Sequence, residues 1–262
     1  MKILRYRTGD GPPAYGILED DGTVLQMIGS PFENFQAGAK VAAVDEVRVL
    51  PPVEPTKIIG VGLNYVSHIE ESGMATPEFP MLFVKPNTAI IGQGDAIVYP
   101  RKGQKVEYEA ELAAVIGRPA RHVAKEHALD YVLGYTCGND VSERVIQLAE
   151  MKMGALLVGK GFDTFNPLGP VVETDVDPGN VDVRARLNGV ERQNANTSDL
   201  LFGVAELVSY ISDAMSLLPG DVIMTGTPAG VGPMAPGNVV EIDIGGIGVL
   251  RNHVIAEEGA GG

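Results

Sequence analysis

Residues 106–117, VEYEAELAAVIG, join three alternating acidic side chains to an apolar run that predicts a β-strand. Glu107, Glu109 and Glu111 are spaced so that all three carboxylates would project from one face of a strand. Three carboxylates on one face repel one another. The simplest way to offset this repulsion is a bound divalent cation that prefers oxygen ligands, Mg²⁺ or Ca²⁺. The same spacing also fits an alternative without a metal, an edge strand whose charged side chains face the solvent. The apolar character of LAAVIG favours a central strand and therefore the metal site.

Composition indicates a folded, strand-rich protein around this segment. Hydrophobic residues make up 45% of the 262 residues and charged residues 21%, which is typical of globular chains and unlike disordered ones. This length allows one large domain with an appendage, or two modest domains. Glycine (33) and proline (18) are abundant, and short apolar runs are rich in valine and isoleucine, which favours strands joined by tight turns. We expect a β-rich α+β fold.

Charge and cysteine content narrow the class of protein. The formal net charge of -14 disfavours nucleic acid as a partner, because non-specific binding to phosphates depends on lysines and arginines. Met1 leads directly into an alternating segment and no apolar run has membrane-spanning length, so we expect a cytoplasmic protein without a membrane partner. The single cysteine, Cys137, excludes an intrachain disulfide, and the apolar YVLGYTCGND around it predicts a buried strand end, which makes it a poor nucleophile.

A break in the periodicity near residue 55 predicts a domain boundary. Strand-like segments and a hairpin signal indicate a small N-terminal β-meander: 2–8, 14–19 and 23–28, with DDG at 20–22. The pattern then weakens, and prolines cluster at 51, 52 and 55. We therefore expect three parts: an N-terminal domain with its linker over 1–55, a main domain over 56–256 and a flexible tail over 257–262.

Hydrophobic periodicity predicts the elements of the main domain. The expected strands are 57–62, 81–86, 107–117, 131–140, 169–174, 181–189, 221–226 and 239–246. The expected helices begin after Asn64, run from Asp140 to about Met153, and cover Asp199 to Met215. No nicotinamide or phosphate-loop site is expected, because the third glycine of the dinucleotide fingerprint falls at Tyr65 and GTPAGVG at 226–232 lacks the loop lysine.

A second group of polar side chains follows the apolar run that ends at Asp140. Arg144 and Gln147 lie four and seven residues further on, so an acid, a cation and an amide would share one face of the predicted helix. For an isolated segment, Asp140 is better interpreted as the N-cap of this helix, with Glu143 completing a capping box. A position near a helix start does not exclude metal binding.

Two further segments carry groups that could take part in chemistry. His68 and Glu71 are three residues apart in a predicted short helix, so the carboxylate could orient the imidazole as a general base, although exposed helix pairs commonly have this spacing. Lys160 lies between two glycines in VGKGFDTFNPLGP, where we expect a loop, and a loop lysine by itself is usually solvated.

Eight segments in combination point to a family. In chain order they are GVGLNYVSHIEE, PMLFVKPNTAIIG, VEYEAELAAVIG, YVLGYTCGNDVSERVIQ, GKGFDTFNPLGP, LNGVERQNANTSDLLF, LLPGDVIMTGTPAGVG and GIGVLRN. From about Lys57 to Asn252 the sequence resembles the bacterial single-chain members of the fumarylacetoacetate hydrolase superfamily. The first fifty-odd residues resemble their small N-terminal domain. The resemblance implies a mixed β-sandwich roll that is generally a homodimer.

The resemblance also implies roles for individual residues. The matching positions are the metal ligands Glu109, Glu111 and Asp140, the substrate-binding residues Arg144, Gln147, Lys160 and Thr227, and the water-activating dyad His68 and Glu71 on a mobile lid. Mg²⁺ or Mn²⁺ is the usual ion, with Ca²⁺ a further candidate, and Lys160 is expected to serve in catalysis as well as binding. Glu107 matches a position that is not normally a ligand. Members often carry a tryptophan shortly before GKGFD, whereas this sequence has MKMGALLVGKG, which alters the expected pocket wall.

The implied function is an Mg²⁺- or Mn²⁺-dependent enzyme that acts on a small 2-oxo or 2-enol (di)carboxylic acid through a metal-stabilised enolate. Three carboxylates leave about three positions of an octahedral Mg²⁺ open, which a 2-oxo acid can chelate. We expect a hydroxyheptadienedioate isomerase or an acylpyruvate or fumarylpyruvate hydrolase of aromatic catabolism. Oxaloacetate decarboxylase is one alternative, and a metal-bound 2-oxo acid binding protein without turnover is another. The pairing of His68 with Glu71 weighs against the latter, since binding alone needs no base.

Overall fold

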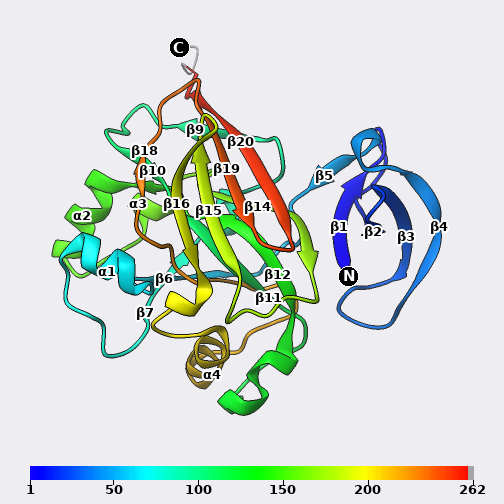
Figure 1. The fold of residues 1–262 in the computed structure, drawn as a ribbon, viewed down its shortest axis with the longest axis horizontal. Coiled ribbons are helices and arrows are strands. Elements are labelled where there is room, and N and C mark those ends of the chain that lie inside the picture. The colour runs from blue at the N-terminus through cyan, green and yellow to red at the C-terminus, as the bar shows by residue number, and fades with distance from the viewer. Residues whose placement is uncertain (259–262) are drawn as a thin grey trace.

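The computed structural model describes residues 1–258, and strands predominate among them (Figure 1). The predicted β-rich α+β fold is confirmed. The end of the predicted tail, 259–262, lies outside the described residues. Over residues 1–258, no helix is both long enough and apolar enough to cross a membrane.

The largest sheet contains twelve strands. They are β1 (Lys2–Arg7), β2 (Ala14–Leu18), β3 (Thr23–Gly29), β4 (Phe35–Ala43), β5 (Arg48–Leu50), β6 (Ile58–Gly62), β7 (Met81–Lys85), β8 (Ile90–Ile91), β11 (Ala110–Ile116), β12 (Val132–Asn139), β14 (Asn166–Glu173) and β17 (Val222–Met224). The main path is β4-β3-β2-β1-β14-β12-β11-β17-β6-β7, with β5 paired to β1 and β8 paired to β14. The centre of this sheet, β11 and β12, is buried along most of its length.

The N-terminal strands form the blue lobe at the right of Figure 1. Strands β1 to β4 pair in sequence as an antiparallel meander, and β1 continues into the main body by pairing with β14, where Ile3 lies opposite Val172. The strand β4 was not predicted, because most of its residues are exposed and lack a period-two apolar pattern. One sheet therefore crosses the predicted domain boundary.

A second sheet packs on the first to form the β-sandwich. Its strands are β9 (Ala96–Tyr99), β15 (Asp182–Leu187), β16 (Val190–Asn196), β19 (Val239–Ile244) and β20 (Gly248–Ala256), in the order β16-β15-β19-β20-β9. In Figure 1, β15, β19 and β20 lie in front of β11, β12 and β14, and each of these three strands contacts that layer. Leu112 and Cys137 from the first layer and Val183, Ile242 and Leu250 from the second are almost completely buried in the core.

A small third sheet and short helices flank the sandwich. The sheet has the order β13-β10-β18, and its strands are β10 (Val106–Tyr108), β13 (Ser142–Glu143) and β18 (Gly232–Pro233). The α-helices are α1 (Val66–Ser72), α2 (Arg144–Lys152), α3 (Val158–Gly161) and α4 (Val204–Ala214). The 3-10 turns are η1 (Val44–Glu46), η2 (Asn87–Ala89), η3 (Lys125–Tyr131) and η4 (Thr197–Asp199). Figure 1 shows α1 and α2 together at one side of the main body.

Two predicted elements differ from the observed ones where the chain bends. The predicted strand 107–117 is two strands in different sheets that part at Glu109, whose N–H donates to the side chain of Asn139 at 3.0 Å. The helix predicted from Asp140 begins at Arg144, and its N-cap is Glu143, whose carboxylate accepts from the Ile146 N–H at 2.6 Å. Interpreting Asp140 as the N-cap was therefore wrong. The predicted helix from Asp199 likewise begins later, at Val204, after a 3-10 turn.

Candidate functional site

The three carboxylates predicted as metal ligands come together at the bend between β10 and β11. The pairing of Ala110 with Asn139 places Glu109 beside Asp140, and Glu111 follows on the same face of β11. One oxygen atom from each carboxylate lies within 4.8 Å of the others, and all three residues are buried. The local geometry thus creates a compact, buried acidic triad, defined as Glu109, Glu111 and Asp140.

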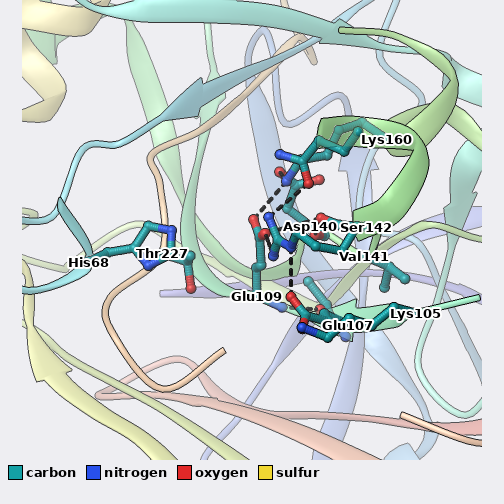
Figure 2. Close-up of polar contacts among 12 residues, drawn as sticks. His68, Lys105, Glu107, Glu109, Asp140, Val141, Ser142, Lys160 and Thr227 are labelled. Carbon is teal, nitrogen blue, oxygen red and sulfur yellow. Dashed lines mark hydrogen bonds and ion pairs between the residues drawn. The ribbon is translucent and has the colours of Figure 1, made fainter. Parts of the chain in front are cut away.

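Two cationic side chains neutralise part of this acidic triad (Figure 2). Lys160 Nζ donates to Glu109 Oε2 at 2.7 Å and to Asp140 Oδ2 at 2.6 Å. Arg144 Nη2 donates to Glu109 Oε1 at 2.5 Å. Burial alone would raise the pKa of Glu109, but the charges of Lys160 and Arg144 hold it well below its usual range. The Glu109 carboxylate is therefore ionised at neutral pH.

Glu111 is the member of the triad without such compensation. Its carboxylate accepts a hydrogen bond from the Gly226 N–H at 2.8 Å, and among residues 1–258 no cationic side chain forms an ion pair with it. Burial, followed by the charges of Asp140 and Glu109, raises its pKa well above the usual value. Additional positive charge at the triad would favour the ionised form of Glu111.

Lys85 is a member of this cluster that the sequence analysis missed. It ends β7, and its ammonium group donates to Asp140 Oδ1 and, at 3.2 Å, to the carbonyl oxygen of Val141. Its side chain has no exposed surface. Alternation in β7 gave a signal that could have revealed it, since Phe83 and Lys85 both occupy inward positions and a charge at an inward position needs a partner.

Lys160 is not on an exposed loop, contrary to the prediction. It lies on the single turn of α3 with 3% of its side chain exposed. Gly159 beside it packs so closely on α2 that a Cβ atom there would come within 2.6 Å of the Gln147 backbone nitrogen. This close approach of α3 to α2 directs the Lys160 ammonium group into the acidic triad. Burial would lower its pKa, but Asp140 and Glu109 raise it.

Arg144 and Gln147, predicted to share a helical face, do so in α2. Arg144 Nη1 donates to Gln147 Oε1 at 2.7 Å, and Arg144 Nε donates to Glu107 Oε2 at 2.6 Å. Glu107 also pairs with Lys105 at 2.8 Å, and its carboxylate is not among the three that lie within 4.8 Å of one another. That Glu107 is not a metal ligand stays a prediction.

His68 and Glu71 form the pair that their spacing in α1 predicted. His68 Nδ1 lies 3.1 Å from Glu71 Oε2, and the other oxygen of Glu71 accepts from the Gly230 N–H at 3.0 Å. Thr227 is buried nearby, and its hydroxyl oxygen accepts from Gln193 Nε2 at 2.8 Å. Figure 2 shows His68 and Thr227 on one side of Glu109, with Lys160 on the other.

One cavity of about 480 Å³ unites these groups. Every residue predicted for the site lines it: His68, Glu71, Glu109, Glu111, Asp140, Arg144, Gln147, Lys160 and Thr227. Its volume suits a small organic acid. Cys137 is instead buried in β12 with its pKa raised to about 12 by burial, as expected of a structural thiol.

Known proteins are similar to this chain in both sequence and fold. Residues 57–255 match the family described as Fumarylacetoacetate (FAA) hydrolase C-terminal, and residues 1–52 match the family described as Rv2993c-like, N-terminal. The solved structure of a 5-carboxymethyl-2-hydroxymuconate delta-isomerase from Mycobacterium smegmatis is 43% identical, with a TM-score of 0.90 over 98% of this chain and 100% of that chain.

Two other relatives have different activities in their names. The solved structure of a maleylpyruvate hydrolase from Sphingobium sp. SYK-6, in complex with manganese(II) and pyruvate, is 28% identical, with a TM-score of 0.80 over 98% of this chain and 100% of that chain. A mitochondrial oxaloacetate tautomerase, fahd2, from Xenopus laevis is 35% identical over 97% of this chain and 90% of its own length. The chain is therefore an enzyme that belongs to the fumarylacetoacetate hydrolase family.

Proposed function

We propose that the enzyme hydrolyses a carbon–carbon bond of 3-acylpyruvates and that Glu109, Glu111 and Asp140 hold the Mg²⁺ or Mn²⁺ it requires. The observation that carries this proposal is that the His68–Glu71 pair and the acidic triad line the same cavity. Hydrolysis needs both a base that activates water and a positive centre that stabilises developing negative charge. The similarity to a maleylpyruvate hydrolase solved with manganese(II) and pyruvate supports the same assignment.

The donor set fits a hard divalent cation. The acidic triad offers only carboxylate oxygens, the ligand type that Mg²⁺ and Mn²⁺ prefer, and Glu111 has no cationic partner within residues 1–258. When bound, the cation would supply Lewis-acid stabilisation of negative charge on the substrate oxygens.

The residues around the triad can bind the substrate and move protons. Arg144 and Gln147 offer a guanidinium and an amide for the substrate carboxylate, and the Lys160 ammonium group places fixed positive charge beside the 2-oxo group. Glu71 accepts from His68 Nδ1, which leaves Nε2 free to take a proton from water. The water oxygen bonds to the acyl carbon, and the bond from that carbon to C3 breaks. The electron pair stays on C3, and its protonation gives pyruvate and a carboxylic acid.

Isomerisation of hydroxyheptadienedioate is the second candidate, favoured by the 43% identity to a delta-isomerase. A further candidate, turnover of oxaloacetate, gains support from the relative described as an oxaloacetate tautomerase. The family resemblance also leads us to propose a homodimer, which sedimentation of the purified protein would test.

A substrate panel tests the proposal. Metal-free enzyme would be assayed with acetylpyruvate, fumarylpyruvate, hydroxyheptadienedioate and oxaloacetate, with and without Mg²⁺ or Mn²⁺. We expect metal-dependent release of pyruvate from an acylpyruvate, and its loss on chelation. Conversion of hydroxyheptadienedioate or oxaloacetate alone would replace hydrolysis by the second or third candidate. Binding across the panel without conversion would indicate a 2-oxo acid binding protein.

A further inference from the structure

Helix α2 changes from polar to apolar along the face that lines the catalytic cavity. Arg144, Gln147, Leu148 and Met151 all line the cavity, at spacings of three, four and seven residues that place them on one helical face. The two polar residues come first and the two apolar residues follow. Between Arg144 and Met151 the helix rises about 10 Å. A substrate whose carboxylate lies at Arg144 therefore meets apolar surface further along α2.

Other apolar side chains also line the cavity. Met74, beyond the end of α1, and Met81, at the start of β7, line the same cavity, as does Leu156 between α2 and α3. Methionine is unbranched and flexible, so its side chain adapts to aliphatic groups of different shape. Leu148 keeps 48% of its surface exposed, so an aliphatic group that lies against it would be removed from water together with that surface.

The charged residues of the cavity leave no cation for a second carboxylate. The described lining contains five carboxylates and three permanent cations: Glu71, Glu107, Glu109, Glu111 and Asp140 against Lys105, Arg144 and Lys160. Arg144 and Lys160 contact the acidic triad, where the first carboxylate and the 2-oxo group of the substrate are proposed to bind, and Lys105 pairs with Glu107 at 2.8 Å. A carboxylate at the apolar end would thus be desolvated without a partner.

We infer that the acyl group of the substrate ends in an uncharged aliphatic chain that lies against Leu148 and Met151. Substrates with a second carboxylate at this end are rejected. The inference rests on the proposed hydrolysis of 3-acylpyruvates, and it selects one class among them.

Two substrates of matched shape test it. In 4-methylpentanoylpyruvate an isopropyl group replaces the terminal carboxylate of succinylpyruvate. We expect kcat/KM to be at least about a hundredfold higher for 4-methylpentanoylpyruvate. Leu148→Arg should lower that ratio at least about tenfold, because it provides a cation for the carboxylate. Val145→Arg, on the same helix but outside the cavity lining, should leave the ratio unchanged. An equal or reversed preference in the wild-type enzyme would overturn the inference.

Measuring the binding of analogues that cannot be cleaved tests this inference independently of the proposed reaction. The analogues 7-methyl-2-oxooctanoate and 2-oxoheptanedioate differ at the same end but lack the second carbonyl, so hydrolysis cannot cleave them. Calorimetry with Mg²⁺ should show at least about tenfold tighter binding of 7-methyl-2-oxooctanoate. That preference without acylpyruvate turnover would contradict only the proposed function. Equal or tighter binding of 2-oxoheptanedioate would overturn the inference whether or not hydrolysis occurs.

Discussion

The ammonium group of Lys85 forms an ion pair with the carboxylate of Asp140, and both side chains are almost completely buried. Lys85 ends β7 at one edge of the largest sheet, whereas Asp140 follows β12, separated from β7 by β11, β17 and β6. The pair therefore joins an edge strand to the centre of the sheet at the acidic triad. It also occupies Asp140 Oδ1, while Lys160 occupies Oδ2.

Replacing Lys85 should destabilise the metal-free protein. Lys85→Met removes one partner of a buried pair and leaves Asp140 with a single cation, so we expect the free energy of unfolding to fall by roughly 3 kcal/mol. Urea denaturation followed by circular dichroism measures the change. Lys125→Met is the matched control, because Lys125 pairs with Glu206 on the surface, with 58% and 39% of the two side chains exposed. That variant should lose less than about 1 kcal/mol. Equal losses in the two variants would show that the buried pair has no special role.

The sequence predicted the strand that contains Lys85 but not its partner. The interaction joins residues 55 positions apart, and only the strand order brings them together. The same limit affects Glu109: alternation correctly placed its carboxylate with that of Glu111, but the bend there depends on the Asn139 side chain. Strand β20 alternates buried and exposed residues, yet it was missed. A polar residue, Asn252, takes one inward position and donates to the carbonyl oxygens of Gly92 and Asp95.

The metal site should depend on Glu111 and not on Glu107. Glu111→Gln removes one carboxylate of the triad, so we expect the binding of Mg²⁺ and Mn²⁺ to become undetectable by isothermal titration calorimetry. Glu107→Gln is the matched control, since the Glu107 side chain pairs with Arg144 and Lys105 outside the triad. It should keep stoichiometric metal. Stoichiometric binding in the Glu111 variant would disprove the ligand assignment.

Cys137 should be dispensable for chemistry. Its thiol is buried between the two sheets, its pKa is raised to about 12 by burial, and its sulfur contacts the Gly248 carbonyl oxygen at 3.3 Å. A thiol of this kind is almost entirely protonated at neutral pH and therefore a weak nucleophile. Cys137→Ala should change kcat by no more than about threefold. In the native protein the thiol should also resist Ellman's reagent until the chain unfolds. A loss of activity with the fold intact would mean that the thiol takes part in the reaction.

His68 should act in the chemical step and not in holding the substrate. Its imidazole is oriented by Glu71, and the Gly230 N–H donates to the other oxygen of Glu71. Within residues 1–258, no hydrogen bond joins His68 to the acidic triad. His68→Ala should therefore lower kcat for an acylpyruvate by roughly a hundred- to ten-thousand-fold, the usual contribution of a positioned base. Binding of Mn²⁺ and of oxalate should stay nearly unchanged, because the groups proposed to hold them remain. Decarboxylation of oxaloacetate should suffer less, since the loss of carbon dioxide needs no attacking water. His127→Ala, which alters an exposed histidine on η3, controls for non-specific effects. The decisive comparison is His68→Ala on both substrates: equal losses, or a loss confined to KM, would show that His68 positions the substrate and that water activation lies elsewhere.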